Sequence, residues 1–222
     1  MTGPRISVLC PTRNRPAGAR RLIDSARAMA AGDVEFILRT DEDAPLGWEE
    51  PGVTEIRGPR GVLSALWNEC AAVAAADIFM QAGDDIVFRS EGWDDQVAEA
   101  FAQVPDRIVF VHGTDLFQPL TFGTHGFVHR RWTEATGYFT PPYFSSDYGD
   151  TWLNDVANMI GRRVCLPGVV TEHLHPVTGK ASWDATYLER MSRGDRDGVH
   201  GLYVSLAGER DSDAAKLRAV MS

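Results

Sequence analysis

Two adjacent carboxylates, Asp84 and Asp85, are the strongest chemical signal in the sequence. They follow the apolar run at residues 78–82 (IFMQA), whose length and composition predict a buried strand. Neighbouring carboxylates at the end of a strand repel each other unless solvent or a cation lies between them. Hard oxygen ligands favour Mg²⁺ or Mn²⁺. The pair therefore indicates a divalent cation site if the surrounding loops suit one.

Charged loops follow the other predicted strands of the N-terminal half. Residues 11–15 (PTRNR) follow the first strand, residues 41–43 (DED) the second and residues 57–60 (RGPR) the third. Ligands of open α/β sheets bind outside the carboxyl ends of the strands. Because a cation neutralises carboxylates and a phosphate together, these acidic and arginine-rich loops predict a metal–diphosphate site. Arginine binds phosphate in a bidentate manner, and we include Arg60 among the candidate ligand contacts.

Two histidines, His173 and His175, form a second group of candidate metal ligands at the end of a predicted strand. If the strand continues, its alternation places both side chains on the same side. Neutral imidazole is a good ligand of divalent metals. A lone histidine is usually structural, but two at this spacing beside a predicted metal site favour a role in binding the ion.

The elements that must position these residues alternate between strands and helices. This alternation predicts an α/β fold with a Rossmann-like, mostly parallel sheet and helices on both faces. We expect one domain over residues 1–178 and a helical C-terminal tail over residues 179–222 packed on it. The expected strands lie at residues 6–10, 34–40, 53–57, 78–82, 107–112, 124–129, 164–166 and 169–173. The expected helices lie at residues 17–31, 62–76, 92–104, 131–136 and 150–160.

Composition and missing motifs exclude several classes of protein. The formal net charge of −9 disfavours a surface that coats a polyanion, although one local cationic groove stays open. The sequence has neither the apolar run of about 18 residues that a membrane helix needs nor a secretory signal, so we expect a cytoplasmic protein. The P-loop, dinucleotide-binding and GxSxG patterns are absent as well. The three cysteines are widely separated, which argues against a disulfide framework.

An ordered set of motifs over roughly residues 5–176 resembles that of family 2 glycosyltransferases, which have the GT-A fold. The resemblance is to a small stand-alone form of bacterial or bacteriophage type. The resemblance implies a nucleotide-sugar donor, with a UDP-sugar favoured, and Mn²⁺ or Mg²⁺ as cofactor. One departure is MQAGDD in place of LDxDD, which puts Gln81 and Gly83 where acids often stand. The motifs are ISVLCPTRNRP, TDEDAP, SALWNECAAVAAA, MQAGDDIVF and YFSSDYGDTWLNDVANMIGRRV.

The resemblance also assigns roles to individual residues. It implies that Asp85 binds the metal, that Asp84 lies near the ribose or the metal, and that His175, narrowly preferred over His173, adds a metal ligand. Residues between the metal motif and the late helix, including His125, would line the acceptor. The implied contacts to the nucleotide-sugar are Pro11, Thr12, Arg13, Asp41, Arg60, Asn68 and Asp84.

In inverting GT-A enzymes an acid at the start of a late helix deprotonates the acceptor hydroxyl. The family spacing, counted back from Gly161, places this general base at Asp150. A helix N-terminus stabilises an ionised carboxylate, as a base requires. Asp147 is the alternative catalytic residue, although capping of the helix explains it more simply.

The expected activity is therefore metal-dependent, inverting transfer of a sugar to an acceptor hydroxyl. The acceptor stays open between a saccharide, a lipid-linked or small molecule, and a hydroxymethylated base of phage DNA, against which the negative charge counts. A sugar nucleotidyltransferase is the alternative enzyme, but PTRNRP lacks the glycines and lysine of its usual N-terminal loop. A non-catalytic module that binds nucleotide-sugars is the alternative outside the enzymes, because Gln81 and Gly83 replace acids.

Overall fold

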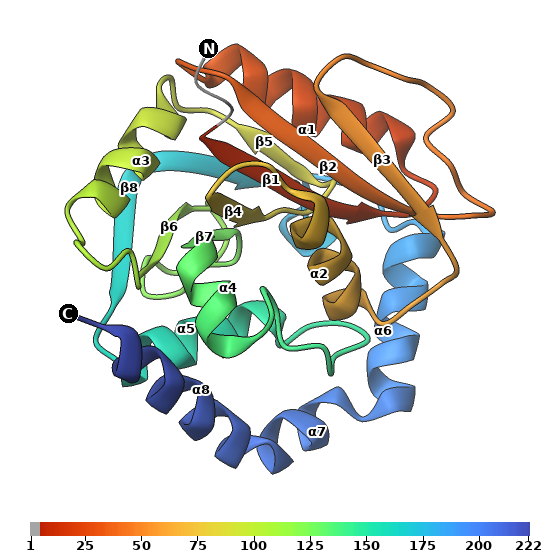
Figure 1. Ribbon diagram of the computed structural model, residues 1–222. Coiled ribbons are helices and arrows are strands. Elements are labelled where there is room, and N and C mark those ends of the chain that lie inside the picture. Colours follow the sequence, from red (N-terminus) through yellow and green to blue (C-terminus); the bar gives the residue numbers. More distant parts are fainter. Residues whose placement is uncertain (1–4) are drawn as a thin grey trace.

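The computed structural model describes residues 5–222, and in this range eight strands form one sheet with helices on both faces (Figure 1). The order of the strands across the sheet is β3-β2-β1-β4-β7-β6-β8-β5. The strands are β1 (Ile6–Thr12), β2 (Val34–Asp41), β3 (Val53–Gly58), β4 (Ile78–Gln81), β5 (Ile86–Phe88), β6 (Phe110–Thr114), β7 (Gly126–His129) and β8 (Arg163–His173). The helices are α1 (Pro16–Met29), α2 (Leu63–Val73), α3 (Trp93–Ala102), α4 (Arg130–Thr136), α5 (Gly149–Met159), α6 (Ala185–Asp197), α7 (Val199–Ser205) and α8 (Ala207–Val220), with a 3₁₀ turn at Pro176–Thr178.

The two halves of the sheet differ in strand direction. Strands β3, β2, β1 and β4 run parallel, as the alternation of strands and helices predicts. In the other half β7 is antiparallel to both β4 and β6, β8 is parallel to β6, and β5 is antiparallel to β8. The expectation of an α/β sheet covered by helices is confirmed, with a parallel N-terminal half and a mixed C-terminal half.

Each face of the sheet carries its own hydrophobic core. In β1, Val8 packs with α1 and α3 on one face, whereas the next residue, Leu9, packs with α2, α4 and α5 on the other. This follows from the two-residue period of a strand. The tail also contributes: Ala214 and Leu217 of α8 are fully buried in the second core. Burial of a leucine side chain contributes about 1.5–3 kcal/mol, so α8 helps to stabilise the fold.

Three details differ from the sequence-based expectations. The strand expected from residue 107 begins at Phe110, because Arg107 has a left-handed φ of 63° that turns the chain first. Two short strands expected at 164–166 and 169–173 are one strand, β8, whose exposed Pro167 and Gly168 lie where its register against β6 shifts. Strand β5 was not expected, since its three residues are too few to form a pattern.

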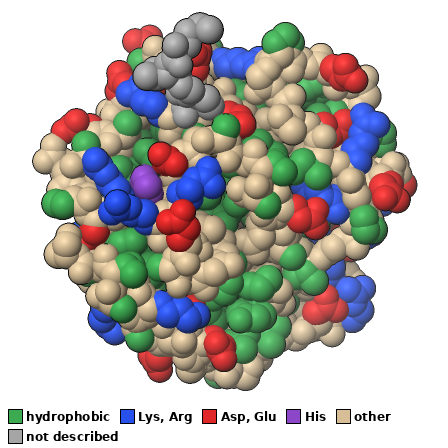
Figure 2. All heavy atoms as spheres, in the orientation of Figure 1, with side chains coloured by type: hydrophobic (Ala, Val, Ile, Leu, Met, Phe, Trp, Pro, Cys, Tyr) green, Lys and Arg blue, Asp and Glu red, His purple; other side chains and the backbone are tan. Residues whose placement is uncertain are grey.

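The surface mixes charges of both signs. On the face drawn in Figure 2, acidic and basic side chains are interspersed. Arginines that pair with carboxylates include Arg13, Arg15 and Arg89. None of the helices in residues 5–222 is long and apolar enough to cross a membrane.

Candidate functional site

A pocket of about 430 Å³ opens at the carboxyl edge of the parallel strands. Its volume lies within the range of small-molecule sites, which is about 300–1,000 Å³. Its wall is formed by the carboxyl ends of β1 and β2, the loops after β1, β3 and β4, the start of α5, the end of β8 and the helix α6. Sequence-predicted residues that line it are Pro11, Thr12, Arg13, Asp41, Arg60, Asp84, Asp85, Asp147, Asp150, His173 and His175.

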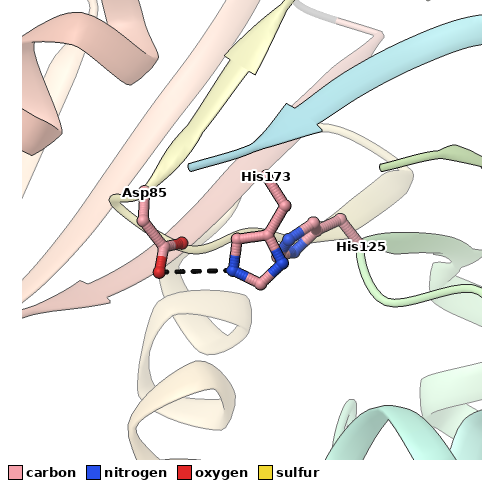
Figure 3. A group of neighbouring side chains, drawn as sticks. All are labelled: Asp85, His125 and His173. Carbon is pink, nitrogen blue, oxygen red and sulfur yellow. Dashed lines mark ion pairs between the residues drawn. The ribbon is translucent and has the colours of Figure 1, made fainter. Parts of the chain in front are cut away.

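Inside the pocket, Asp85, His125 and His173 form a group that could hold a metal ion (Figure 3). One ligand atom from each residue lies within 4.8 Å of the others. Strand pairing brings two of them together, because Ile86 of β5 is opposite His173 of β8 and the amide of Leu174 donates to the carbonyl of Asp85 at 2.7 Å. His125 reaches the group from the loop that precedes β7.

The two histidines of this group carry different charges. Burial lowers the pKa of His125 to about 4, so its ring is neutral, and its Nε2 is buried without a hydrogen-bond partner among the described residues. Burial alone would lower the pKa of His173 too, but the carboxylates of Asp115 and Asp85 outweigh it and raise the value to about 9. His173 therefore carries a positive charge between two carboxylates, 3.4 Å from Asp85 and 3.5 Å from Asp115. Because a histidine must be neutral to bind a metal, a divalent cation bound here would take the place of this proton between the two carboxylates.

The adjacent carboxylates Asp84 and Asp85 have separate environments. Asp84 is bound by the protein, since the hydroxyl of Thr12 donates to Oδ2 at 2.6 Å and the guanidinium of Arg15 to Oδ1 at 3.1 Å. Burial and the neighbouring Asp85 raise the pKa of Asp84 to about 6. Burial would raise the pKa of Asp85 as well, but His173 and the hydroxyl of Tyr187 hold it well below its usual range. Asp85 is thus the ionised carboxylate at the group of possible metal ligands.

Gly83, which stands where related motifs often have an acid, has a steric reason to be glycine. A Cβ built at this position would lie 2.5 Å from Oδ1 of Asp85 and 3.6 Å from Cε1 of His125. Any side chain there would push against the carboxylate that faces the two histidines.

Elsewhere in the pocket wall, Arg13 binds Asp41, the last residue of β2, and Asp43 of the loop that follows it. Its guanidinium donates to Asp41 at 2.6 Å and to Asp43 at 2.6 and 2.9 Å. Asp41 is buried and also lies 3.6 Å from Arg39. Two arginines therefore keep a carboxylate fixed where the motifs predict contacts to a nucleotide base.

The two candidate bases at the start of α5 are also distinct. Asp150 lies in the first turn, accepts a hydrogen bond from the amide of Thr151 at 2.7 Å, and has a pKa that burial raises to about 6. Asp147 precedes the helix with a left-handed φ of 38°, and its carboxylate pairs with Arg190. The expectation that Asp147 caps the helix is wrong, because Tyr148 is the N-terminal cap residue and no side chain caps the helix.

Two other expectations fit the structure poorly. Asn68 does not contribute to the described wall of the pocket. Its side-chain Nδ2 donates to the backbone carbonyl of Thr140 at 2.8 Å, and its Oδ1 accepts from the backbone amides of Phe139 and Thr140. It therefore anchors a loop. His175, the preferred metal ligand, lines the pocket but is outside the group around Asp85, since its Nδ1 accepts from the amide of Val177.

Sequence reasoning missed two parts of the pocket. His125, expected near the acceptor, lies beside Asp85 and His173. The tail helix α6 contributes Tyr187, Glu189, Arg190 and Arg193 to the wall. Neither part carries a local motif, so only the folded chain brings them to the site.

This chain resembles known proteins in structure but not detectably in sequence. No family model matches the sequence, and no curated protein matches it either. Among solved structures, the mannosyltransferase PcManGT from Pyrobaculum calidifontis, in complex with GDP-Man and Mn²⁺, is 15% identical, with a TM-score of 0.62 over 99% of this chain and 74% of that chain. The chain has a GT-A-like glycosyltransferase fold.

TarS 1–349 of S. aureus has the same GT-A-like arrangement. It is 11% identical in sequence, with a TM-score of 0.57 over 75% of this chain. Its complex with UDP is 12% identical, with a TM-score of 0.56. The alignment spans only 59% of the length of TarS 1–349. At these identities the likeness concerns the fold, which is as the sequence motifs predict.

Proposed function

We propose that this chain is a metal-dependent, inverting glycosyltransferase that moves a sugar from a nucleotide-sugar, preferably a UDP-sugar, to an acceptor hydroxyl. The observation that carries the proposal is that one pocket at the sheet edge contains both the Asp85, His125 and His173 group and the carboxylate of Asp150. The first could hold a cation with a diphosphate, and the second has the position and pKa of a general base. Membership of family 2 stays a prediction from the motifs.

The candidate metal ligands favour Mn²⁺ over Mg²⁺ as the bound ion. Two imidazole nitrogens and one carboxylate make a poorer site for Mg²⁺, which prefers oxygen ligands and water. The unpartnered Nε2 of His125 and the low pKa of Asp85 provide a neutral nitrogen and an ionised oxygen, as metal ligation requires. A bound ion would neutralise the diphosphate and stabilise the negative charge that develops on the leaving group.

We infer that the donor would bind with its base towards the carboxyl ends of β1 and β2. Pro11, Thr12, Arg13 and Asp41 lie there, and Arg60 lies on the wall beside them. The diphosphate would extend from this end towards Asp85. We propose that the held carboxylate of Asp41 accepts a hydrogen bond from the base, while Asp84 fixes the loop after β1 through Thr12 and Arg15.

Transfer then needs a single proton acceptor. Asp150 takes the proton of the acceptor hydroxyl as that oxygen forms a bond to the anomeric carbon of the donor. The bond between this carbon and the diphosphate oxygen breaks, and the electron pair leaves with the nucleoside diphosphate. Attack from the side opposite the diphosphate inverts the anomeric configuration. A positioned general base contributes about 10²–10⁴-fold to the rate.

Release of nucleoside diphosphate from UDP- and GDP-sugars tests the proposal. We expect release with Mn²⁺, none with EDTA, and stabilisation of the fold by the productive donor in a thermal-shift assay. Absence of both release and stabilisation across the nucleotide-sugars would overturn the proposal. Stabilisation without release, even with candidate acceptors present, would instead favour the non-catalytic binding module.

A further inference from the structure

The tail helix α6 is joined to the pocket through several polar contacts. Asp184, which caps α6, accepts two hydrogen bonds from Arg15, at 2.8 and 2.6 Å. The hydroxyl of Thr186 donates to the carbonyl of Arg13 at 3.3 Å, and Arg190 pairs with Asp147. In Figure 1, α6 (light blue) runs away from the sheet edge at which these loops lie. The helix is thus held against both the β1 loop and the start of α5.

Within α6, Tyr187 contacts the candidate metal group directly. Its side chain is almost fully buried, and its hydroxyl donates to Oδ2 of Asp85 at 2.6 Å. The guanidinium carbon of Arg15 lies 3.9 Å from the centre of the tyrosine ring, and the ring of His175 meets it edge to face at 5.3 Å. Packing on two sides therefore fixes the position of the hydroxyl.

This hydrogen bond makes the two oxygens of Asp85 different. Oδ2 accepts from Tyr187 and faces Nε2 of His173 at 3.4 Å. Oδ1 lies on the side of Gly83 and accepts no hydrogen bond from the described residues. A carboxylate held by a neutral donor at one oxygen keeps a single orientation, which is how outer partners commonly tune a metal ligand.

Tyr187 also lines two cavities. Together with Arg15, Asp84 and Asp85, it lines both the main pocket and a neighbouring cavity of about 360 Å³. Without the hydroxyl, water from the second cavity would reach Oδ2 and would hydrogen-bond it in more than one geometry.

We propose that Tyr187 is a positioning residue that orients Asp85 for cation binding through one carboxylate oxygen. The inference rests on the metal site of the proposed function but not on sugar transfer. It makes the helix α6 part of the proposed metal centre, although no ligand of the group comes from it. The alternative role for the same contact, in which the hydroxyl competes with the cation for Asp85, predicts the opposite change in affinity.

The test is the affinity for Mn²⁺ alone, measured without nucleotide from the electron paramagnetic resonance signal of the free ion at neutral pH. Tyr187→Phe keeps the ring and removes only the hydroxyl, and we expect it to weaken Mn²⁺ binding by about 10–100-fold, as loss of an outer partner of a metal ligand usually does. The matched control is Tyr203→Phe, because Tyr203 also donates to an aspartate, Asp155, but outside the described pocket wall. The control should bind Mn²⁺ as the unchanged protein does.

Unchanged or tighter binding in Tyr187→Phe would overturn the proposal, and tighter binding would identify the hydroxyl as a competitor. Circular dichroism on the same samples gives the folded fraction, to which the affinities are normalised. Failure of the unchanged protein to bind Mn²⁺ would refute the metal site and this proposal together. Normal Mn²⁺ binding with no release of nucleoside diphosphate would refute sugar transfer while leaving the role of Tyr187 intact.

Discussion

His173 Nε2 lies 3.4 Å from Asp85 Oδ2, because β8 and β5 pair antiparallel and place His173 opposite the residue that follows Asp85. His173 thereby lies beside the Asp84 and Asp85 pair, although the two are far apart in the sequence. The charge relation between them is strong, since the two carboxylates beside His173 raise its pKa to about 9 despite burial. This pairing is the basis of the first prediction.

His173→Ala should weaken Mn²⁺-supported nucleotide binding by at least about tenfold. Loss of a residue that only hydrogen-bonds a metal ligand already lowers metal affinity by that much. His175→Ala is the matched control, because its ring lines the same pocket and its Nδ1 only accepts from the amide of Val177. Calorimetric titration of UDP and GDP with Mn²⁺ measures both variants. A larger loss in His175→Ala would restore the sequence-based preference for that residue.

Asp150 should set the acid limb of the pH profile. Its pKa is raised from the ordinary value of 3.8 to about 6, so the ionised base is present above this pH and is lost as the pH falls through it. Turnover should therefore decrease about tenfold for each pH unit below 6. Asp150→Asn should lower turnover by about 10²–10⁴-fold with little change in donor affinity.

Asp147→Asn is the control for this prediction and should keep most of the activity, since Asp147 pairs with Arg190 outside the helix. If Asp147→Asn is inactive and Asp150→Asn has normal activity, Asp147 is the general base instead of Asp150. Full activity in both variants would refute an aspartate base at the start of α5.

The glycine before the acidic pair should be intolerant of substitution. A Cβ at Gly83 would lie 2.5 Å from Oδ1 of Asp85, so Gly83→Ala should displace this carboxylate and weaken Mn²⁺ binding. Gly201→Ala in α7 is the control: apart from its own stretch of helix, no atom lies within 4 Å of the added Cβ, and alanine is the better helix former. The same resonance assay measures both, and equal Mn²⁺ affinities would contradict the steric account.

Sequence could predict the features that depend on local patterns. The apolar run at residues 6–10 predicted strand β1, and the rule for open sheets predicted Asp84 and Asp85 at the edge where the pocket opens. The resemblance preferred His175 over His173, whereas His173 is the one that lies beside Asp85, because that choice depends on the pairing of β8 with β5, a strand of only three residues. His125 and Tyr187 come from segments without a motif, and only tertiary packing brings them to Asp85.

The tail should matter for stability as well as for the pocket. Leu217 of α8 is fully buried in the second core, so Leu217→Ala should lower the free energy of unfolding by about 2–5 kcal/mol. Val220→Ala in the same helix is the control, because Val220 is 52% exposed and its loss should have little effect. Urea denaturation followed by circular dichroism measures both. Equal stabilities would show that α8 adds nothing to the core.

We expect Asp85 to belong to a metal site that holds the diphosphate of a nucleotide. Calorimetric titration of UDP and GDP into the protein and into Asp85→Ala, each with Mn²⁺ and with EDTA, tests this expectation. At least one of the two nucleotides should bind the unchanged protein only when Mn²⁺ is present, and a folded Asp85→Ala variant should show no Mn²⁺-dependent binding. Nucleotide affinity that is the same in EDTA, or the same in Asp85→Ala, would contradict it.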